Sequence, residues 1–414
     1  MAHSKIDIPI LFTTRIIRLF AYGFLSVILA LYLVQVGLRA QEVGLLLTLT
    51  LAGDAVISLG ITTSADRIGR RRMLIIGALL MVFAGIVFVV TQNFLLMIVA
   101  AVIGVISPSG NEIGPFLSIE QASLSQLLPS QKRTQVFAWY NLVGSFATAT
   151  GALSSGLLAQ HLQSNSFTPL ESYRVVLAGY AACGIVLALL FLCLSPAIET
   201  AASPSVGNRA LGLHRSKGVV LKLSALFALD AFAGGFIIQS IMAYWFYLKF
   251  GVAEGTLGSI FFGANILAGI SALLAARIAA RIGLINTMVF THLPSNILLC
   301  LVPFMPTLPL AIGLLLLRFS ISQMDVPTRQ SYTMAVVSPD ERSAASGVTT
   351  IARSTGAALS PAISGVFLAA PFLMNAPFLL AGGLKIAYDL LLYRSFNKVK
   401  PPEENASFSI TTKK

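Results

Sequence analysis

The sequence predicts an all-α membrane protein whose twelve transmembrane helices form two halves of six helices each. Of the 414 residues, 56% are hydrophobic and only 11% are charged, whereas soluble domains are about one-quarter charged. Apolar segments about as long as a bilayer crossing recur along the whole chain. The loops between these segments are alternately rich and poor in Lys and Arg, which is typical of a protein that crosses the membrane many times.

Each expected crossing is a segment of roughly 20 or more mostly apolar residues. The twelve segments cover residues 9–36, 42–64, 73–91, 94–127, 134–161, 173–195, 219–248, 255–279, 286–305, 309–337, 342–370 and 374–395. An even number of crossings places both termini on one side. The fourth segment contains Ser107-Pro108-Ser109-Gly110 and Gly114-Pro115, which predict a broken helix, because Pro and Gly free backbone groups that only a protein-lined or wet place can satisfy.

The basic residues fix the orientation of the chain. Of the 28 Lys and Arg, three lie in one set of loops (Arg39, Arg174 and Lys249) and six lie inside apolar segments, which leaves nineteen in the opposite loops and the tails. Basic loops stay in the cytoplasm, so we expect an inner-membrane protein with both termini cytoplasmic. The same rule explains the net charge of +12 without a nucleic-acid partner.

The predicted domains are the halves 1–195 and 219–395, the cytoplasmic linker 196–218 and a disordered cytoplasmic tail, 396–414. An internal repeat at an offset of 214 residues supports the two halves. The residue pairs that match at this offset are Gly37 with Gly251, Gly44 with Gly258, and Arg67-Ile68-Gly69 with Arg281-Ile282-Gly283. Parallel six-helix repeats are a known plan of transporters.

A short basic loop, residues 65–72, joins the second and third crossings and reads Ala-Asp-Arg-Ile-Gly-Arg-Arg-Arg. It resembles the cytoplasmic signature of the major facilitator superfamily, Gly-x-x-x-Asp-Arg-x-Gly-Arg-Arg/Lys, although Thr62 stands where the family has its first Gly. The resemblance implies the major facilitator fold, with crossings one, four, seven and ten lining a central cavity between two rocking halves. In the family's exporters the fifth crossing carries a Gly-Pro-rich signature. The fifth crossing of this chain is also rich in glycine, but the Pro of the signature is missing.

We interpret this loop as a gating latch. Gly69 allows a tight turn between helices, and Asp66 can cap a helix or pair with an Arg. The residues assigned to the latch are Asp66, Arg67, Gly69, Arg70 and Arg71. The alternative is that the arginines serve only as topology signals.

Ionisable residues inside the crossings are the candidate site, because each costs about 2.5–3.5 kcal/mol at a helix centre and therefore needs a reason. Counted at about 1.5 Å per residue, five lie near the midplane: Arg18, Asp54, Asp230, Arg318 and Arg353. Arg15, Glu112, Glu120, Asp325 and Arg329 lie nearer the cytoplasm. The predicted substrate- and proton-binding residues are Arg15, Arg18, Asp54, Glu112, Asp230, Arg318, Asp325 and Arg353. The alternative is a set of buried ion pairs that only fix helix packing.

Three further ionisable residues receive no part in this site. Lys385 and Asp389, at positions i and i+4, are interpreted as a structural pair. His292 stands alone and is given no role.

The sequence therefore predicts a secondary transporter of a small organic solute, not an enzyme, because it contains no GxxxxGK[ST], HExxH or GxSxG motif. We expect a monomer in the lipid bilayer that needs no metal or cofactor. A proton gradient acting on Asp54, Glu112 or Asp230 is the expected energy source. Efflux by proton antiport is the favoured direction, and proton-coupled uptake of an anionic metabolite is the alternative. A non-transporting membrane sensor is a rival of another class.

Overall fold

The computed structural model describes residues 4–111, 116–128, 130–199, 213–338 and 341–399. Every regular element in these ranges is a helix, which confirms the predicted all-α class. The chain divides into two compact units. Unit 1 comprises Met1–Ser205, Ile238–Ile266 and Pro361–Met374, and unit 2 comprises Val206–Ile237, Leu267–Ser360 and Asn375–Lys414. The predicted boundary between two sequence halves, within residues 196–218, stays a prediction.

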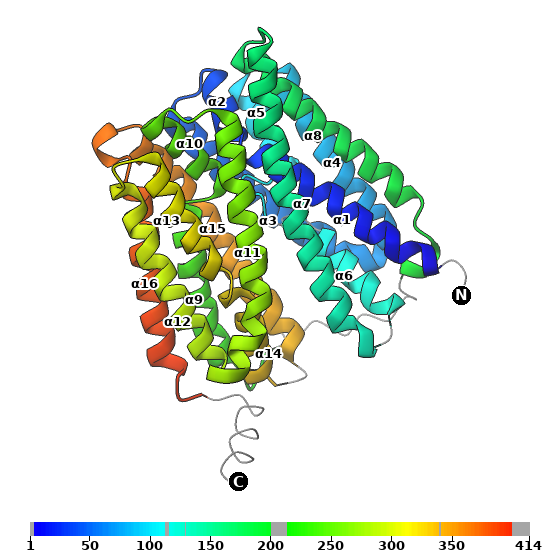
Figure 1. The fold of residues 1–414 in the computed structure, drawn as a ribbon. Helices are drawn as coiled ribbons and strands as arrows, with labels where there is room; N and C mark the ends of the chain where they lie inside the picture. The colour runs from blue at the N-terminus through cyan, green and yellow to red at the C-terminus, as the bar shows by residue number, and fades with distance from the viewer. Residues whose placement is uncertain (1–3, 112–115, 129, 200–212, 339–340, 400–414) are drawn as a thin grey trace. The chain divides into compact units, whose positions relative to one another are not determined.

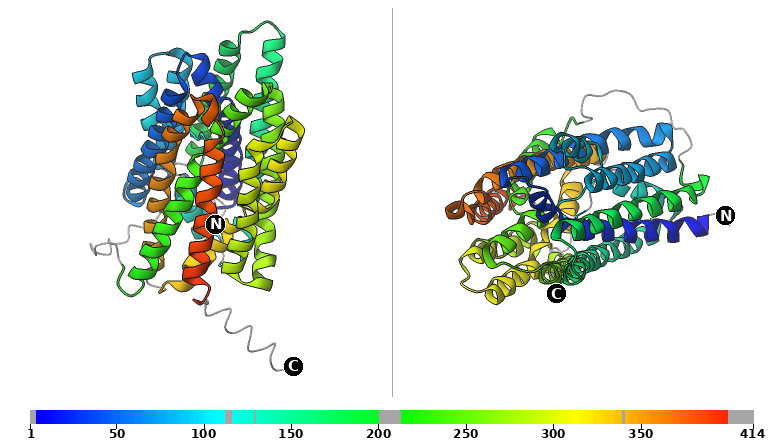
Figure 2. Two further views of the ribbon diagram at one scale, coloured as in Figure 1. Left: turned by 90° about the vertical axis from the view of Figure 1, so that its left-hand side faces the viewer. Right: turned by 90° about the horizontal axis from the view of Figure 1, so that it is seen from above.

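Unit 1 is built mainly from the first part of the chain. Its helices are α1 (Ser4–Ser26), α2 (Leu29–Gln35), α3 (Ala40–Ile68), α4 (Arg70–Val90), α5 (Phe94–Ile103), α6 (Phe116–Leu127), α7 (Ser130–Ser164), α8 (Pro169–Leu192), η1 (Pro196–Ile198), α10 (Gln239–Phe250) and η5 (Pro371–Leu373). Helix α4 packs along α8, and α1 packs between α7 and α8, as the views from the side and from above show (Figures 1 and 2).

Unit 2 contains the remaining helices. They are α9 (Lys217–Gly235), α12 (Leu284–Leu301), η3 (Val302–Phe304), α13 (Leu308–Ser322), α14 (Asp325–Val336) and α16 (Ala376–Phe396). Helix α11 (Glu254–Ile282) begins in unit 1 and ends in unit 2, and α15 (Arg342–Leu368) begins in unit 2 and ends in unit 1. An apolar core joins α9, α12, α14 and α16 through Phe227, Met288, Tyr332 and Tyr388.

Ten helical stretches in the described ranges are long and apolar enough to cross a membrane. Two predicted crossings are not among them. The fourth is split into α5 and α6, as its Pro and Gly residues predict, and neither piece is long enough alone. The eleventh, α15, is rich in Ser, Thr and Gly, which lowers its hydropathy. With these two, the helices account for the twelve predicted crossings.

In the part of the chain that the structure describes, four crossings are interrupted, namely the first, fourth, seventh and tenth. The interruptions separate α1 from α2, α5 from α6, α9 from α10, and α13 from α14. These positions recur at every third crossing, so the broken crossing begins each successive group of three helices. Broken helices at membrane depth occur where backbone is buried in protein or lines a water-filled cavity, so these four crossings are the ones suited to contact a solute.

Unit 1 ties its first helices to segments that come much later in the chain. Ser26 accepts a hydrogen bond from Gln239 Nε2 at 2.7 Å, and its carbonyl accepts one from Ser240 Oγ at 2.6 Å. Glu254, buried at the start of α11, accepts hydrogen bonds from Tyr173 at 2.5 Å and Gln163 at 3.1 Å. These contacts bind the break between α1 and α2 to the start of α10, and the start of α11 to α7 and α8.

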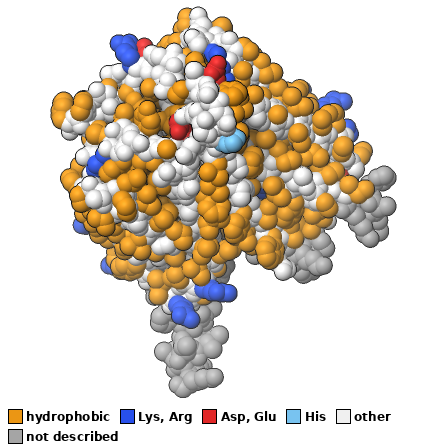
Figure 3. Space-filling model, turned by 45° about the horizontal axis from the view of Figure 1, so that its top comes forward, with side chains coloured by type: hydrophobic (Ala, Val, Ile, Leu, Met, Phe, Trp, Pro, Cys, Tyr) orange, Lys and Arg blue, Asp and Glu red, His pale blue; other side chains and the backbone are white. Residues whose placement is uncertain are grey.

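The outer surface of the molecule is apolar. Hydrophobic side chains cover most of the face shown in Figure 3. Large ones such as Val56, Val90 and Leu95 are more than 70% exposed. Such extensive apolar exposure is typical of a protein surrounded by lipid.

Candidate functional site

Two groups of charged side chains are buried inside the helices, one in each unit. The first centres on Glu120 of α6, which is fully buried. Arg18 of α1 donates to both oxygens of this carboxylate at 2.6 Å, a bidentate geometry that adds strength and specificity. Thr14 donates to Glu120 at 3.1 Å, and the Tyr140 hydroxyl donates to it as well. We call these four residues the Glu120 cluster.

Arg15 lies beside the Glu120 cluster. Its Nε donates to the carbonyl of Tyr140 at 2.7 Å, its guanidinium lies 4.3 Å from the centre of the Tyr140 ring, and a terminal nitrogen donates to Asn141 at 3.2 Å. Gly144 makes room for it, because a methyl group there would come within 2.8 Å of Nε. Arg15 is thus bound tightly to α7.

The sequence analysis placed Arg18 among the midplane charges and Glu120 nearer the cytoplasm, so their pairing is a new finding. Counting residues gives the height of a side chain but not the direction in which it points, so it could not identify Glu120 as a partner of Arg18. Asp54, the other acid of this half at the midplane, is half-buried on α3 and accepts a hydrogen bond from Ser58 at 3.3 Å. Glu112 lies outside the described residues.

The second group centres on Asp230 of α9, which is 4% exposed. Lys385 of α16 donates to its Oδ1 at 2.5 Å. Arg329 of α14 and Arg353 of α15 both donate to its Oδ2 at 3.2 Å. Four helices of unit 2 therefore place three cationic side chains on one carboxylate.

A histidine connects Asp230 to a second acid. The Nδ1 atom of His292 lies 2.8 Å from Asp389, while its Nε2 lies 4.0 Å from Asp230. Asn296 also donates to Asp389, at 3.0 Å. The imidazole thus has one nitrogen directed at each carboxylate.

Asp325 and Arg318 complete this group. Asp325 pairs with Arg329 at 2.8 Å, one helical turn away on α14. Arg318, on α13, is 6% exposed, and the charges of Asp325 and Asp230 act on it. The Asp230 cluster, as we name it, comprises Asp230, His292, Arg318, Asp325, Arg329, Arg353, Lys385 and Asp389.

Four of the eight residues of the Asp230 cluster are among the predicted substrate- and proton-binding residues, namely Asp230, Arg318, Asp325 and Arg353. Arg329 was predicted to lie near the site. The interpretation of Lys385 and Asp389 as a structural pair is wrong, because Lys385 binds Asp230 and Asp389 binds His292. His292, which was given no role, lies between two acids. These three residues could have been found in the sequence as ionisable residues deep in a crossing. Such residues are uncommon enough that each is a candidate site residue by itself.

The predicted gating loop lies at the turn between α3 and α4. Gly69 has φ of +116°, a conformation that favours glycine. Glu199 accepts hydrogen bonds from the backbone N–H groups of Arg70 at 2.7 Å and Arg71 at 3.1 Å. A carboxylate at these positions satisfies free N–H groups and the helix dipole at the start of α4.

The arginine side chains anchor the same loop. Arg70 donates to Gln126 at 3.0 Å and to the carbonyl of Ile198 at 3.2 Å, and Arg71 donates to the carbonyl of Leu192 at 2.6 Å. The Arg67 side chain is exposed, and the Asp66 side chain lies outside the described residues. The partners of Arg70 and Arg71 named above all belong to unit 1, so the role of the loop as a latch between halves stays a prediction.

A carboxylate also binds the segment that leads into α9, the helix that carries Asp230. Glu341 accepts hydrogen bonds from the backbone N–H groups of His214, Arg215 and Ser216, the last two at 2.7 and 2.8 Å. Burial raises the pKa of the Glu341 carboxyl, but these hydrogen bonds and that of the Ser216 side chain outweigh it and lower the pKa to about 2. The carboxylate is therefore ionised at physiological pH and stabilises the start of α9.

Replacing Gly69 tests the loop. We expect Gly69→Ala to lower the free energy of unfolding by about 1 kcal/mol or more, because its φ is unfavourable for alanine and the new methyl group would lie 3.3 Å from Glu199. Solute transport should slow as well. Thermal unfolding in detergent and transport into vesicles measure the two effects. Gly60→Ala, in the helix that precedes Gly69 but with open space beside it, is the control and should be neutral or slightly stabilising. Equal stability and equal transport rates of the two variants would contradict the role of Gly69.

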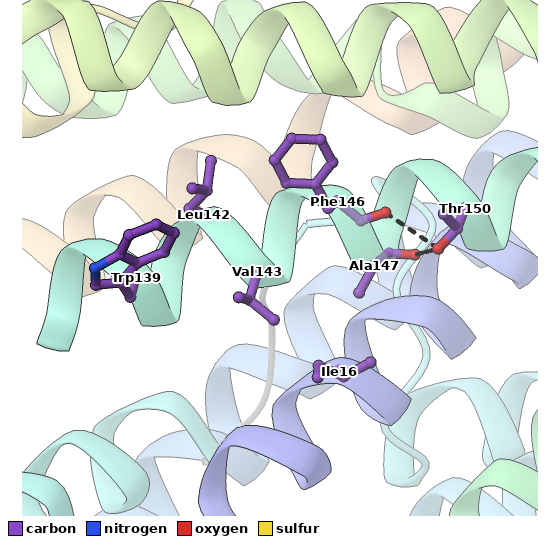
Figure 4. Close-up of a pocket in the computed structure, with 7 residues that line it drawn as sticks. All are labelled: Ile16, Trp139, Leu142, Val143, Phe146, Ala147 and Thr150. Carbon is purple, nitrogen blue, oxygen red and sulfur yellow. Dashed lines mark hydrogen bonds between the residues drawn. The ribbon is translucent and has the colours of Figure 1, made fainter. Parts of the chain in front are cut away.

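A hollow of about 350 Å³ between α1 and α7 is a less suitable site. It is lined by Ile16, Trp139, Leu142, Val143, Phe146, Ala147 and Thr150 (Figure 4). The hydroxyl of Thr150 bonds the carbonyls of Phe146 and Ala147 in its own helix. The lining contains no charged group, so it offers a solute little beyond apolar contact.

Known proteins resemble this chain along nearly its whole length. The family model described as Major Facilitator Superfamily matches residues 11–361 and, in a second match, residues 225–413. An uncharacterized membrane protein of Saccharomyces cerevisiae is 30% identical, over 93% of each chain.

Solved structures share the fold at low sequence identity. A bacterial homolog of the human lysosomal transporter Spinster, in an inward-facing and occupied conformation, superposes with a TM-score of 0.74 at 16% identity, over 96% of this chain and 98% of the other. A D-xylose–proton symporter superposes with a TM-score of 0.70 at 15% identity, over 96% and 98% of the two chains.

Proposed function

Because this chain belongs to the Major Facilitator Superfamily, whose members move small solutes across membranes by alternating access, we propose that it is a proton-coupled transporter of a small organic solute, with the Asp230 cluster as its solute and proton site. One observation carries this proposal: a buried carboxylate, that of Asp230, holds three cationic side chains from three other helices.

Protonation of Asp230 would release these cations. A neutral carboxyl binds Arg and Lys weakly, so Arg329, Arg353 and Lys385 would become available to hydrogen-bond acceptors of a solute. Conversely, a solute that occupies these donors makes Asp230 take up a proton more readily. Such coupling is reciprocal: proton and solute raise each other's affinity.

His292 provides a route for the proton. Its two ring nitrogens face Asp389 and Asp230, and an imidazole can accept a proton on one nitrogen and donate one from the other. A proton could pass from one carboxylate to the other through the ring. The cycle would end when solute and proton leave together and the cations return to Asp230.

Binding of proton and solute together favours symport, and hence uptake when the outside is acidic. Efflux by antiport, the direction that the sequence analysis favours, requires instead that proton and solute exclude one another. The two directions give opposite proton movements in one assay.

The assay uses purified protein in liposomes that contain a pH-sensitive dye. A solute found by thermal-shift screening is added outside. Symport should acidify the lumen, and Asp230→Asn should abolish the acidification while protein-free liposomes show none. Alkalinisation of the lumen would establish antiport and contradict the symport proposal. Solute entry without any pH change would contradict proton coupling altogether.

A further inference from the structure

Arg318 stands out in the Asp230 cluster. Its side chain is 6% exposed, and its Nε atom, which is buried, has no hydrogen-bond partner among the described residues. The guanidinium lies 4.8 Å from the ring of Phe319, next to it in the chain. A buried arginine in a membrane normally pairs with an acid or a backbone carbonyl, or it serves a transported ligand.

The two acids whose charges act on Arg318, Asp325 and Asp230, are engaged by other residues, and so is the third acid of the cluster, Asp389. Asp325 pairs with Arg329 at 2.8 Å, and Asp230 holds three cations. Asp389 is bound by His292 and Asn296. Apart from His292, the cluster contains four Lys and Arg side chains and three carboxylates, so the cationic side chains outnumber the acids by one.

We propose that the solute is a small organic anion whose carboxylate or phosphate binds Arg318; the inference rests on the transport function proposed above. The anion supplies the missing negative charge and an acceptor for the guanidinium, whose planar fork matches the oxygens of both groups. Arg353 is the second donor, because it is 34% exposed whereas the side chains of Arg329 and Lys385 are 7% and 10% exposed. A cationic solute would be repelled, and a neutral one would leave the excess charge uncompensated.

Arg174 is a second arginine against which Arg318 can be compared. Its Nε atom is also buried without a hydrogen-bond partner, but it lies on α8 in unit 1, hydrogen-bonds with Tyr32 and is only half-buried. Arg174 therefore provides a matched control.

The test measures binding by thermal unfolding of the purified full-length chain in detergent, without any gradient. The probes are pairs that differ in charge, at constant ionic strength: benzoate with benzamide, and phenyl phosphate with phenol. At least one anion should raise the melting temperature of the wild type while its neutral counterpart does not. Comparing the two pairs distinguishes a carboxylate site from a phosphate site.

The variants locate the binding. Arg318→Gln should weaken the affinity for the anion about ten- to a hundredfold, the effect of losing a charged hydrogen bond. Arg318→Lys should keep the charge but lose the bidentate geometry, so it should bind less tightly than the wild type and serves where Arg318→Gln does not fold. Arg174→Gln should bind as the wild type does.

The inference is overturned if no anion stabilises the wild type, if neutral counterparts stabilise it equally, or if both Arg318 variants bind normally. Anion binding without proton movement in liposomes would refute the proposed function but leave the inference intact. Proton-coupled transport of a neutral solute, but not of an anion, would support the proposed function and refute the inference.

Discussion

Replacing Asp230 by asparagine should destabilise the protein by about 3–5 kcal/mol, the cost of leaving buried charges uncompensated. Arg329, Arg353 and Lys385 would all lose their shared acceptor, and Arg329 alone would keep an acid, Asp325. Thermal or denaturant unfolding in detergent measures the loss.

Two further variants identify the cause. Asp54→Asn makes the same chemical change at a half-buried position and should cost less than about 1 kcal/mol. The double change Asp230→Asn with Lys385→Met removes one of the released charges and should recover much of the stability. Unchanged stability of Asp230→Asn would mean that Asp230 does not hold the cations together.

Replacing Arg18 by glutamine should have a similar effect in unit 1. It leaves Glu120, which is fully buried, without its bidentate partner, and we expect a loss of about 3–5 kcal/mol. The double change Arg18→Gln with Glu120→Gln replaces the ion pair by two amides and should restore most of the stability. Double-variant analysis of this kind separates the pair from its surroundings.

The control for Arg18 is Arg174→Gln, at a half-buried arginine of the same unit. It should change stability by less than about 1 kcal/mol. If Arg18→Gln instead folds normally and only loses solute binding, the Glu120 cluster is a binding site and not a scaffold. A double variant that is as unstable as Arg18→Gln would likewise contradict the structural role.

The fold could be predicted because lipid imposes it. A chain in a bilayer must satisfy its backbone within each helix, so apolar length and loop charge suffice to locate crossings. The breaks within the crossings are harder to predict from the sequence. Pro108 and Gly110 predict the break between α5 and α6, but the break at Val27–Ile28 has no Pro or Gly within it, and only packing explains it.

The site could be predicted only in part. Depth along a helix follows from residue number, which predicts that Asp230, Arg318 and Arg353 lie at one level, and Arg353 does bind Asp230. The ion-pair partner of a charged side chain depends on how its helix is rotated and on which helices lie beside it. Both are set by tertiary packing. Hence Arg18 was not assigned to Glu120, and the four-residue spacing of Lys385 and Asp389 suggested a local pair although each binds another helix.

The central claim is that solute binding and protonation of Asp230 favour each other. Calorimetric titration of the solute in two buffers of different ionisation enthalpy measures the number of protons taken up on binding. We expect uptake of up to about one proton per solute in the wild type, and none in a folded variant that combines Asp230→Asn with Lys385→Met. Proton release on binding, or equal uptake in both proteins, would contradict the account.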